Sequence, residues 1–87
     1  MEEKVQNICL EIINEYFKEA ENIIDFNKNK FEIQKQRAEV SNEFEIKTAD
    51  KCVEIINENY DNKNDTINIV NFVKSEIQQK KIKILGF

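Results

Sequence analysis

The chain has 87 residues, of which 40% are hydrophobic and 34% are charged, and its net charge at pH 7 is −4. This length makes one domain, and the apolar content suffices for a folded core, so the composition excludes a disordered chain. There is no proline, and the single glycine is Gly86. Because tight hairpin turns favour glycine, Asn-Gly or Asp-Gly, the composition also argues against an all-β fold.

Residue usage points to the source and the compartment. Fourteen Ile, twelve Asn and twelve Lys residues all have A/T-rich codons, so we expect a low-GC bacterium, its phages or its plasmids. The start Met1-Glu-Glu-Lys does not resemble a signal peptide, and no apolar run reaches the roughly 18 residues of a membrane span. We therefore expect a cytoplasmic protein that does not bind membranes.

The stretch from Val5 to Phe26 predicts one long amphipathic helix that organises the rest of the chain. At 100° per residue its apolar side chains fall in one continuous arc covering more than half the circumference. A helix packed on one neighbour needs a stripe of only about 100°. The wider arc predicts two neighbours, or one neighbour and a partner chain. Its members are Val5, Ile8, Cys9, Leu10, Ile12, Ile13, Tyr16, Phe17, Ala20, Ile23, Ile24 and Phe26.

The segment 31–47 follows a polar turn at 27–30 and fits two structures. In a helix its apolar residues share a narrow stripe, whereas in strands they alternate with period two, as Phe31/Ile33 and Phe44/Ile46 do. Good helix formers fill the space between them, and residues 35–37 have no turn chemistry, so the helix is favoured. The alternative is an α+β fold with a β-hairpin in 30–47.

Two further helices follow. Asn42 with Glu45 resembles a capping box, and Thr48 is a second candidate cap. The predicted inner face of the next helix is Ile46, Ala49, Cys52, Val53, Ile56 and Tyr60. Residues 61–64 form a polar loop, and Asp65 is a good N-cap for the last helix. The predicted inner stripe of the last helix is Ile67, Val70, Val73 and Ile77, widened by Ile69 and Phe72.

These patterns predict an all-α fold. We expect a small bundle of three to four helices with short polar loops, in one domain over residues 1–87. The helices lie near 3–26, 30–41, 44–60 and 65–80, and the middle two fuse if the break at 41–42 does not form. Ile82 and Ile84 alternate with lysines as in an edge strand, so residues 81–87 are expected to form an extended or frayed tail; the alternative is that the segment continues the last helix.

The residues that most chemistry needs are missing. There is no histidine, which removes the Ser-His and Cys-His nucleophilic pairs, and no Gly-rich loop cradles phosphate. Cys9 and Cys52 lie on apolar faces and are expected to be buried free thiols, and two cysteines cannot complete a structural zinc site. Glu11, Glu15 and Glu19 line one helix flank, which we interpret as a solvated face. We expect no catalytic residue, no metal and no cofactor, and therefore no enzyme.

Charge is segregated along the chain. Residues 1–25 carry seven acids and two lysines, whereas residues 74–87 carry four lysines and one acid. A nucleic-acid-binding regulator could use the basic segment 28–37 and the C-terminal lysines to contact phosphates. The net charge of −4 and the single arginine weigh against this alternative. The residues concerned are Lys28, Lys30, Lys35, Arg37, Lys80, Lys81 and Lys83.

The favoured function is a small protein-binding regulator or inhibitor encoded by a phage or mobile element, for example an inhibitor of a host defence nuclease. Its expected partner-binding residues are Glu11, Glu15, Leu85 and Phe87. The wide apolar faces also predict self-association, and a closed homodimer is the commonest form. A third alternative is a structural subunit of a helical assembly. The residues resemble no family, and they do not identify the partner.

Overall fold

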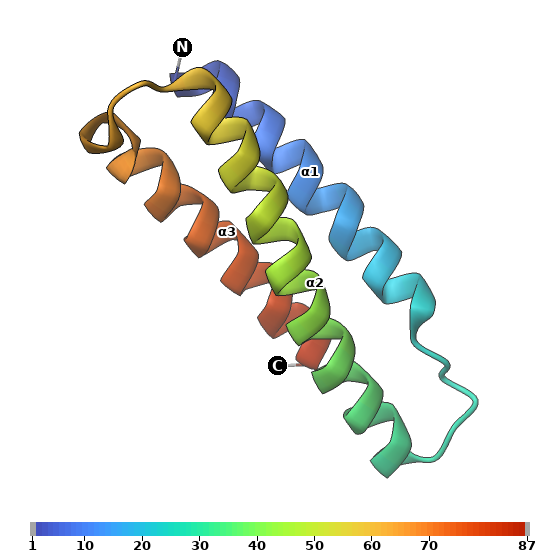
Figure 1. Cartoon of the computed structure of the whole chain (residues 1–87). Coiled ribbons are helices and arrows are strands. Elements are labelled where there is room, and N and C mark those ends of the chain that lie inside the picture. Colours follow the sequence, from blue (N-terminus) through green and yellow to red (C-terminus); the bar gives the residue numbers. More distant parts are fainter. Residues whose placement is uncertain (1, 87) are drawn as a thin grey trace.

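The computed structural model describes residues 2–86, which form three α-helices and one short 3-10 helix. Helix α1 spans Glu2–Ile23, α2 spans Lys30–Asn59, η1 spans Lys63–Thr66 and α3 spans Ile67–Leu85. Successive helices are antiparallel and form an elongated bundle with extents of 48 × 17 × 16 Å (Figure 1). The all-α prediction is confirmed, and because segment 30–47 is helical, the hairpin alternative is wrong.

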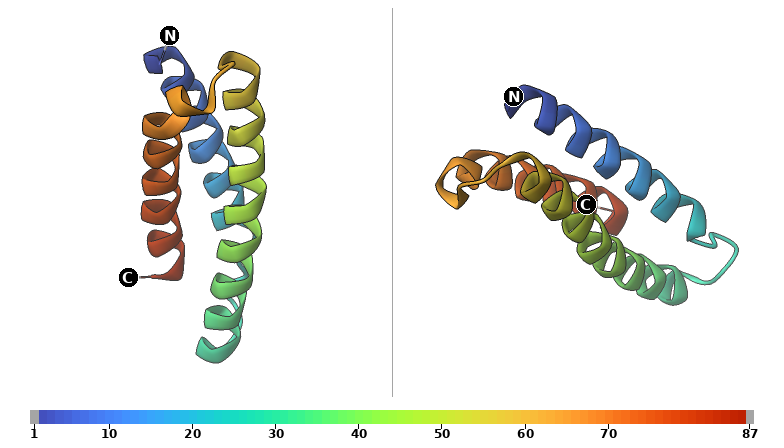
Figure 2. Two further views of the ribbon diagram at one scale, coloured as in Figure 1. Left: turned by 60° about the vertical axis from the view of Figure 1, so that its left-hand side comes forward. Right: turned by 45° about the horizontal axis from the view of Figure 1, so that its top comes forward.

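Helix α1 packs against both other helices (Figure 2), which explains its wide apolar arc. Its buried residues follow a spacing of four residues, and they are Val5, Cys9, Ile13 and Phe17, followed by Ala20. The helix ends at Ile23, three residues before the predicted end. Here the backbone N–H of Asn27 donates to Oδ1 of Asp25 at 3.0 Å, closing a turn that leaves Phe26 in the loop.

Helix α2 is continuous over 30 residues, so the predicted break at 41–42 does not form. Asn42 and Thr48, the candidate caps, both lie inside it. The hydroxyl of Ser41 donates to the carbonyl of Ala38 at 3.0 Å and is compatible with the helix. The cap is Asn29, whose Oδ1 accepts the backbone N–H of Glu32 at 2.9 Å.

The core face of α2 also differs from the predicted one. Its apolar core residues are Val40, Phe44, Cys52 and Ile56, and fully buried Thr48 completes this row at a spacing of four. Cys52 and Ile56 of the predicted face are buried and Ala49 and Tyr60 pack against the core, so these four were assigned correctly. Ile46 and Val53, which were expected to be inside, are 63% and 48% exposed.

Helix α3 begins with Thr66 at the N-cap position, while Asp65, the predicted cap, lies within η1. Its buried residues are Ile69, Val73, Ile77 and Ile84, and Ile67 is exposed. Residues 81–85 continue the helix instead of forming an extended or frayed tail, because Ile84 still packs in the core. Gly86 ends the helix with a left-handed φ of 90°, which glycine adopts without strain.

Candidate protein-binding surface

At one end of the bundle the first turns of α2 are not covered by the other helices. The first turns of this helix project beyond the end of α3 (Figures 1 and 2). The loop 24–29 runs beside them and is held by Gln36, whose Oε1 accepts the backbone N–H of Asp25 at 2.9 Å and whose Nε2 donates to the Asp25 carbonyl at 3.3 Å. We call residues 23–39 and 80–86 together the loop end.

The loop end carries three exposed apolar side chains. Phe31 is 79% exposed and Phe26 is 60% exposed, and Ile23, the last residue of α1, is also exposed. Single exposed apolar residues are common on proteins, whereas several exposed large apolar side chains at one end of a bundle are the kind of surface that proteins use for interaction. The two phenylalanines are therefore the first candidates for contact with a partner.

Arg37 is fixed next to this aromatic surface. Its guanidinium carbon lies 5.6 Å from the centroid of the Phe26 ring, a cation–π distance. On its other side lies Gly86, where an added Cβ would collide with the Nη1 atom of Arg37. Among residues 2–86 the Nε atom of Arg37 is buried and has no hydrogen-bond partner. A positively charged donor is thus held in place between the loop and α3.

A pocket of about 270 Å³ opens beside Arg37. Apolar walls come from Ile24, Phe26 and Ile84, and the charged rim consists of Arg37, Lys83 and Glu21. All three helices and the loop contribute to it. Its volume is below the roughly 300–1,000 Å³ of small-molecule sites. The pocket is suited to one apolar side chain of a partner, with a carboxylate near the two cations.

The structure brings together the two basic segments that the sequence places far apart. Residues 23–39 and 80–86 contain seven cations against three acids, Asp25, Glu32 and Glu39. The cations are the predicted nucleic-acid set, Lys28, Lys30, Lys35, Arg37, Lys80, Lys81 and Lys83. Lys81 is already paired with Glu45 of α2 at 3.3 Å. The opposite end, residues 2–8 and 54–66, has six acids against two lysines, and we call it the acidic end.

The predicted protein-binding residues do not form one surface. Glu11 and Glu15 are exposed along α1, and Glu11 lines a hollow of about 510 Å³ formed by α1 side chains. Leu85 is half-buried at the loop end, and Phe87 lies outside the described residues. Sequence reasoning missed Phe26 and Phe31 as surface residues. The turn-forming neighbours Asp25 and Asn27 were the signal that Phe26 leaves the helix.

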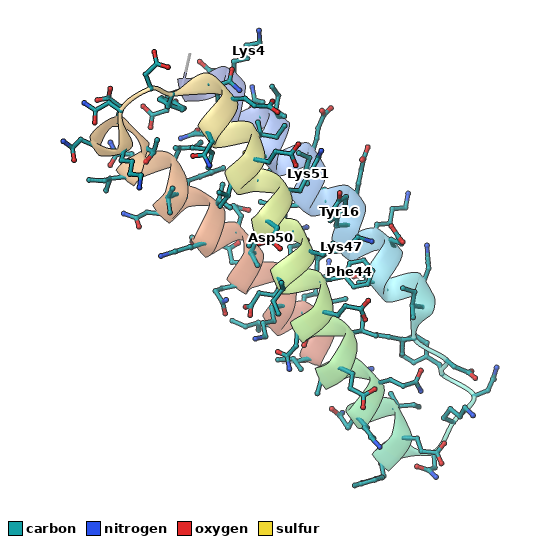
Figure 3. The ribbon with its side chains drawn as sticks, viewed as in Figure 1. Lys4, Tyr16, Phe44, Lys47, Asp50 and Lys51 are labelled. Carbon is teal, nitrogen blue, oxygen red and sulfur yellow. The ribbon has the colours of Figure 1, made fainter. Side chains whose placement is uncertain are left out.

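One further cation has a structural role. Lys47 lies in the seam between α1 and α2, beside Tyr16 and Phe44 (Figure 3). Its Nζ atom is 5.4 Å from the Tyr16 ring centroid and 5.1 Å from that of Phe44. These distances are typical of cation–π contacts that help hold helices together.

The two cysteines are buried and free, as predicted. The thiol of Cys52 points to the carbonyl oxygen of Cys9, with a distance of 3.9 Å between sulfur and oxygen. Burial raises the pKa of Cys52 to about 12 and also raises the pKa of Cys9. Because the thiolate is the reactive form, neither residue is suited to act as a nucleophile at neutral pH.

Within residues 2–86, no group of three or more acidic, cysteine or histidine side chains could hold a metal ion.

Comparison with known proteins adds no relative. No family model matches the chain, and searches of curated proteins and of solved structures found no similar chain. Among the described helices, none has both the length and the apolar character needed to cross a membrane.

Proposed function

We propose that the protein is a small non-enzymatic binding module or inhibitor that docks on another protein through its loop end. The observation that carries this proposal is the exposure of Phe26 and Phe31 at the loop end, where Phe26 lines a side-chain-sized pocket next to Arg37. Aromatic residues and arginine are enriched where protein interfaces concentrate their binding energy. The two rings would supply the apolar contact area, and the pocket would hold one anchor residue of the partner.

The charge of the loop end indicates an acidic partner. The loop end contains seven cations and only three acids, whereas the rest of the chain carries most of the negative charge. An acidic surface on the partner would be attracted to this end and repelled by the acidic end, which orients the encounter. Rim charges of this kind mainly change the association rate, while the buried anchors determine how long the complex lasts.

A protein partner fits this charge pattern better than nucleic acid. Arg37 is stacked on Phe26 and Lys81 is paired with Glu45. The three acids of the loop end lie among the remaining lysines, and phosphates would also meet the acidic flank of α1. Few phosphates could therefore be neutralised at once.

Nucleic acid is the second candidate, because both basic segments meet at one end next to exposed aromatic rings. Single-stranded bases stack on such rings, and their binding weakens steeply with salt.

Site-specific photocrosslinking tests the proposal. The photoreactive residue p-benzoylphenylalanine replaces Phe31 in one version of the protein and Asn14, an exposed residue of α1, in the control. In a cell extract of the source organism, position 31 should give one discrete adduct that excess unlabelled protein removes. Position 14 should give none.

Digestion and variants then separate the two candidates. A protease-sensitive adduct that is lost in a Phe26→Ser, Phe31→Ser double variant supports the protein partner. A nuclease-sensitive adduct that a Lys30→Ala, Lys35→Ala, Arg37→Ala triple variant abolishes supports nucleic acid instead. The same adduct from both positions, or none from position 31, would refute a binding surface at the loop end.

A further inference from the structure

The exposed apolar side chains outside the loop end form a second group. They lie on α2 and α3 and are between 48% and 63% exposed. The group consists of Ile46, Val53, Ile67 and Ile82. Together with the three at the loop end, these are all the exposed large apolar residues of the described chain. Their restriction to two helices calls for a surface that covers them.

Contacts between α2 and α3 place the four residues on one face. Glu45 contacts Lys81 and Gln78 across the two helices. Ile46 and Ile82 each directly follow a residue of this bridge, so each lies one step of 100° further around its helix. Phe44 and Ile84 are in the core, and both steps turn away from it. Because the two helices are antiparallel, the steps lead to the same outer side.

Helical spacing adds the other two residues to this face. Val53 comes seven residues after Ile46, and Ile67 comes eleven residues before Gln78, so each is within about 20° of that position on its helix. We call Ile46, Val53, Ile67 and Ile82 the lateral patch. It runs along the side of the bundle between α2 and α3, whereas the candidate partner surface lies at the loop end.

The polar group in the middle of the lateral patch already has its partners within the chain. The Glu45 carboxylate accepts the Nε2 donor of Gln78 at 2.6 Å and the Nζ donor of Lys81 at 3.3 Å. A partner that excluded water from this face would therefore bury a charge that is already paired and hydrogen-bonded. An unpaired charge in this position would oppose docking.

We propose that the lateral patch binds the lateral patch of a second copy of this chain, in an antiparallel two-fold dimer. The outline of the bundle's side, 48 Å by 17 Å, covers about 800 Å², which is large enough to contain the area per subunit of a standard stable interface. An end face of 17 Å by 16 Å offers about 270 Å², far below that size. Size alone therefore selects side-by-side over end-to-end association.

Charge selects the antiparallel direction. The loop end has an excess of four cations and the acidic end an excess of four acids. Side by side, an antiparallel pair brings each loop end towards the acidic end of the other copy. A parallel pair would place like charges together at both ends, which is unfavourable. The loop ends stay at the two extremes of the dimer, where each could still meet the proposed partner.

The geometry of this dimer also predicts a specific contact between the two copies. Lys35 precedes Val53 by 18 residues, which is five helical turns, so it lies on the same line along α2. Asp61 follows the other end of this helix. A two-fold axis passing between Ile46 and Val53 brings Lys35 of one copy towards Asp61 of the second copy, and this contact occurs twice.

Analytical ultracentrifugation at tens of micromolar tests the proposal. The wild type should have twice the 10.4 kDa mass of the chain. An Ile46→Gln, Val53→Gln double variant should be monomeric or show a dissociation constant raised at least tenfold. The matched control Ile23→Gln removes a similarly exposed isoleucine outside the patch and should stay dimeric. Far-UV circular dichroism should show unchanged helix in all three, because the substituted residues are exposed.

Charge exchange tests the direction. Lys35→Glu and Asp61→Lys should each weaken the homodimer by about tenfold, since each places like charges together twice. An equimolar mixture of the two variants should restore dimerisation, because the new glutamate then faces the new lysine. A monomeric wild type, a dimer insensitive to the Ile46→Gln, Val53→Gln change, or a mixture that stays monomeric would overturn the proposal. None of these outcomes affects the crosslinking test at the loop end.

Discussion

Thr48 offers a direct test of the core described above. It is fully buried in the middle of α2, and among the described residues its hydroxyl oxygen has no hydrogen-bond partner. A buried hydroxyl without a partner costs about 1–3 kcal/mol. Valine has nearly the same shape and a similar helix propensity but lacks the hydroxyl. We expect Thr48→Val to raise the free energy of unfolding by about 1–2 kcal/mol.

For a domain of this size such a gain raises the melting temperature by about 4–8 °C per kcal/mol. Urea unfolding followed by circular dichroism measures it, and the m-value should not change because the same surface is exposed. Thr48→Ser is the matched control, since it keeps the hydroxyl, loses a methyl group and should destabilise by about 1 kcal/mol. If Thr48→Val is neutral or destabilising, the hydroxyl is satisfied in solution and the reasoning fails.

Four further predictions concern other parts of the fold. Ellman's reagent should not label Cys9 or Cys52 at pH 8 until urea unfolds the chain; rapid labelling of the folded protein would contradict their burial. Because the pKa of Cys52 rises from 9.0 to about 12 on folding, the unfolded chain loses this proton first, so the free energy of unfolding should fall between pH 9 and 12, less so in Cys52→Val. Gly86→Ala should lower the free energy of unfolding, measured in urea, by about 1 kcal/mol, since alanine disfavours a positive φ and its Cβ would displace Arg37. Gly86→Asn should lower it by less. Asn29→Ala removes the α2 cap and should cost about 0.5–2 kcal/mol, with faster amide exchange confined to the first turns of the helix.

Periodicity was enough to predict the helices but not their limits. The apolar arc from Val5 onwards identified α1 and its two neighbours, because every fourth residue on that face is apolar. In α2 the predicted break at 41–42 divided one helix into two, although Ser41 is buried inside that helix. A pattern counted on apolar residues alone also left Thr48 out of the core row and assigned Ile46 and Val53 to it, which hid the lateral patch. The end of α1 was also placed too late, because Phe26 continues the apolar pattern in a loop.

The sequence could predict the separate segments of the candidate surface but not their meeting at one end of the bundle. The basic character of segments 28–37 and 80–83 was visible in the sequence. Their meeting depends on topology, since three successive antiparallel helices bring the start of α2 and the end of α3 to one end. The role of Arg37 depends on contacts with Phe26 and Gly86, residues separated by 60 positions. No local pattern encodes such a contact.

The odd number of helices has an electrostatic consequence for all variants of the loop end. The carboxyl ends of α1 and α3 lie there, while α2 contributes its amino end. Each helix carries a dipole equivalent to about half a charge at each end. Two negative poles and one positive pole leave a net negative pole at the loop end, and the cations there oppose it. Replacing Lys83, near the end of α3, should therefore cost about 0.3–1 kcal/mol of folding stability, even in the absence of any partner.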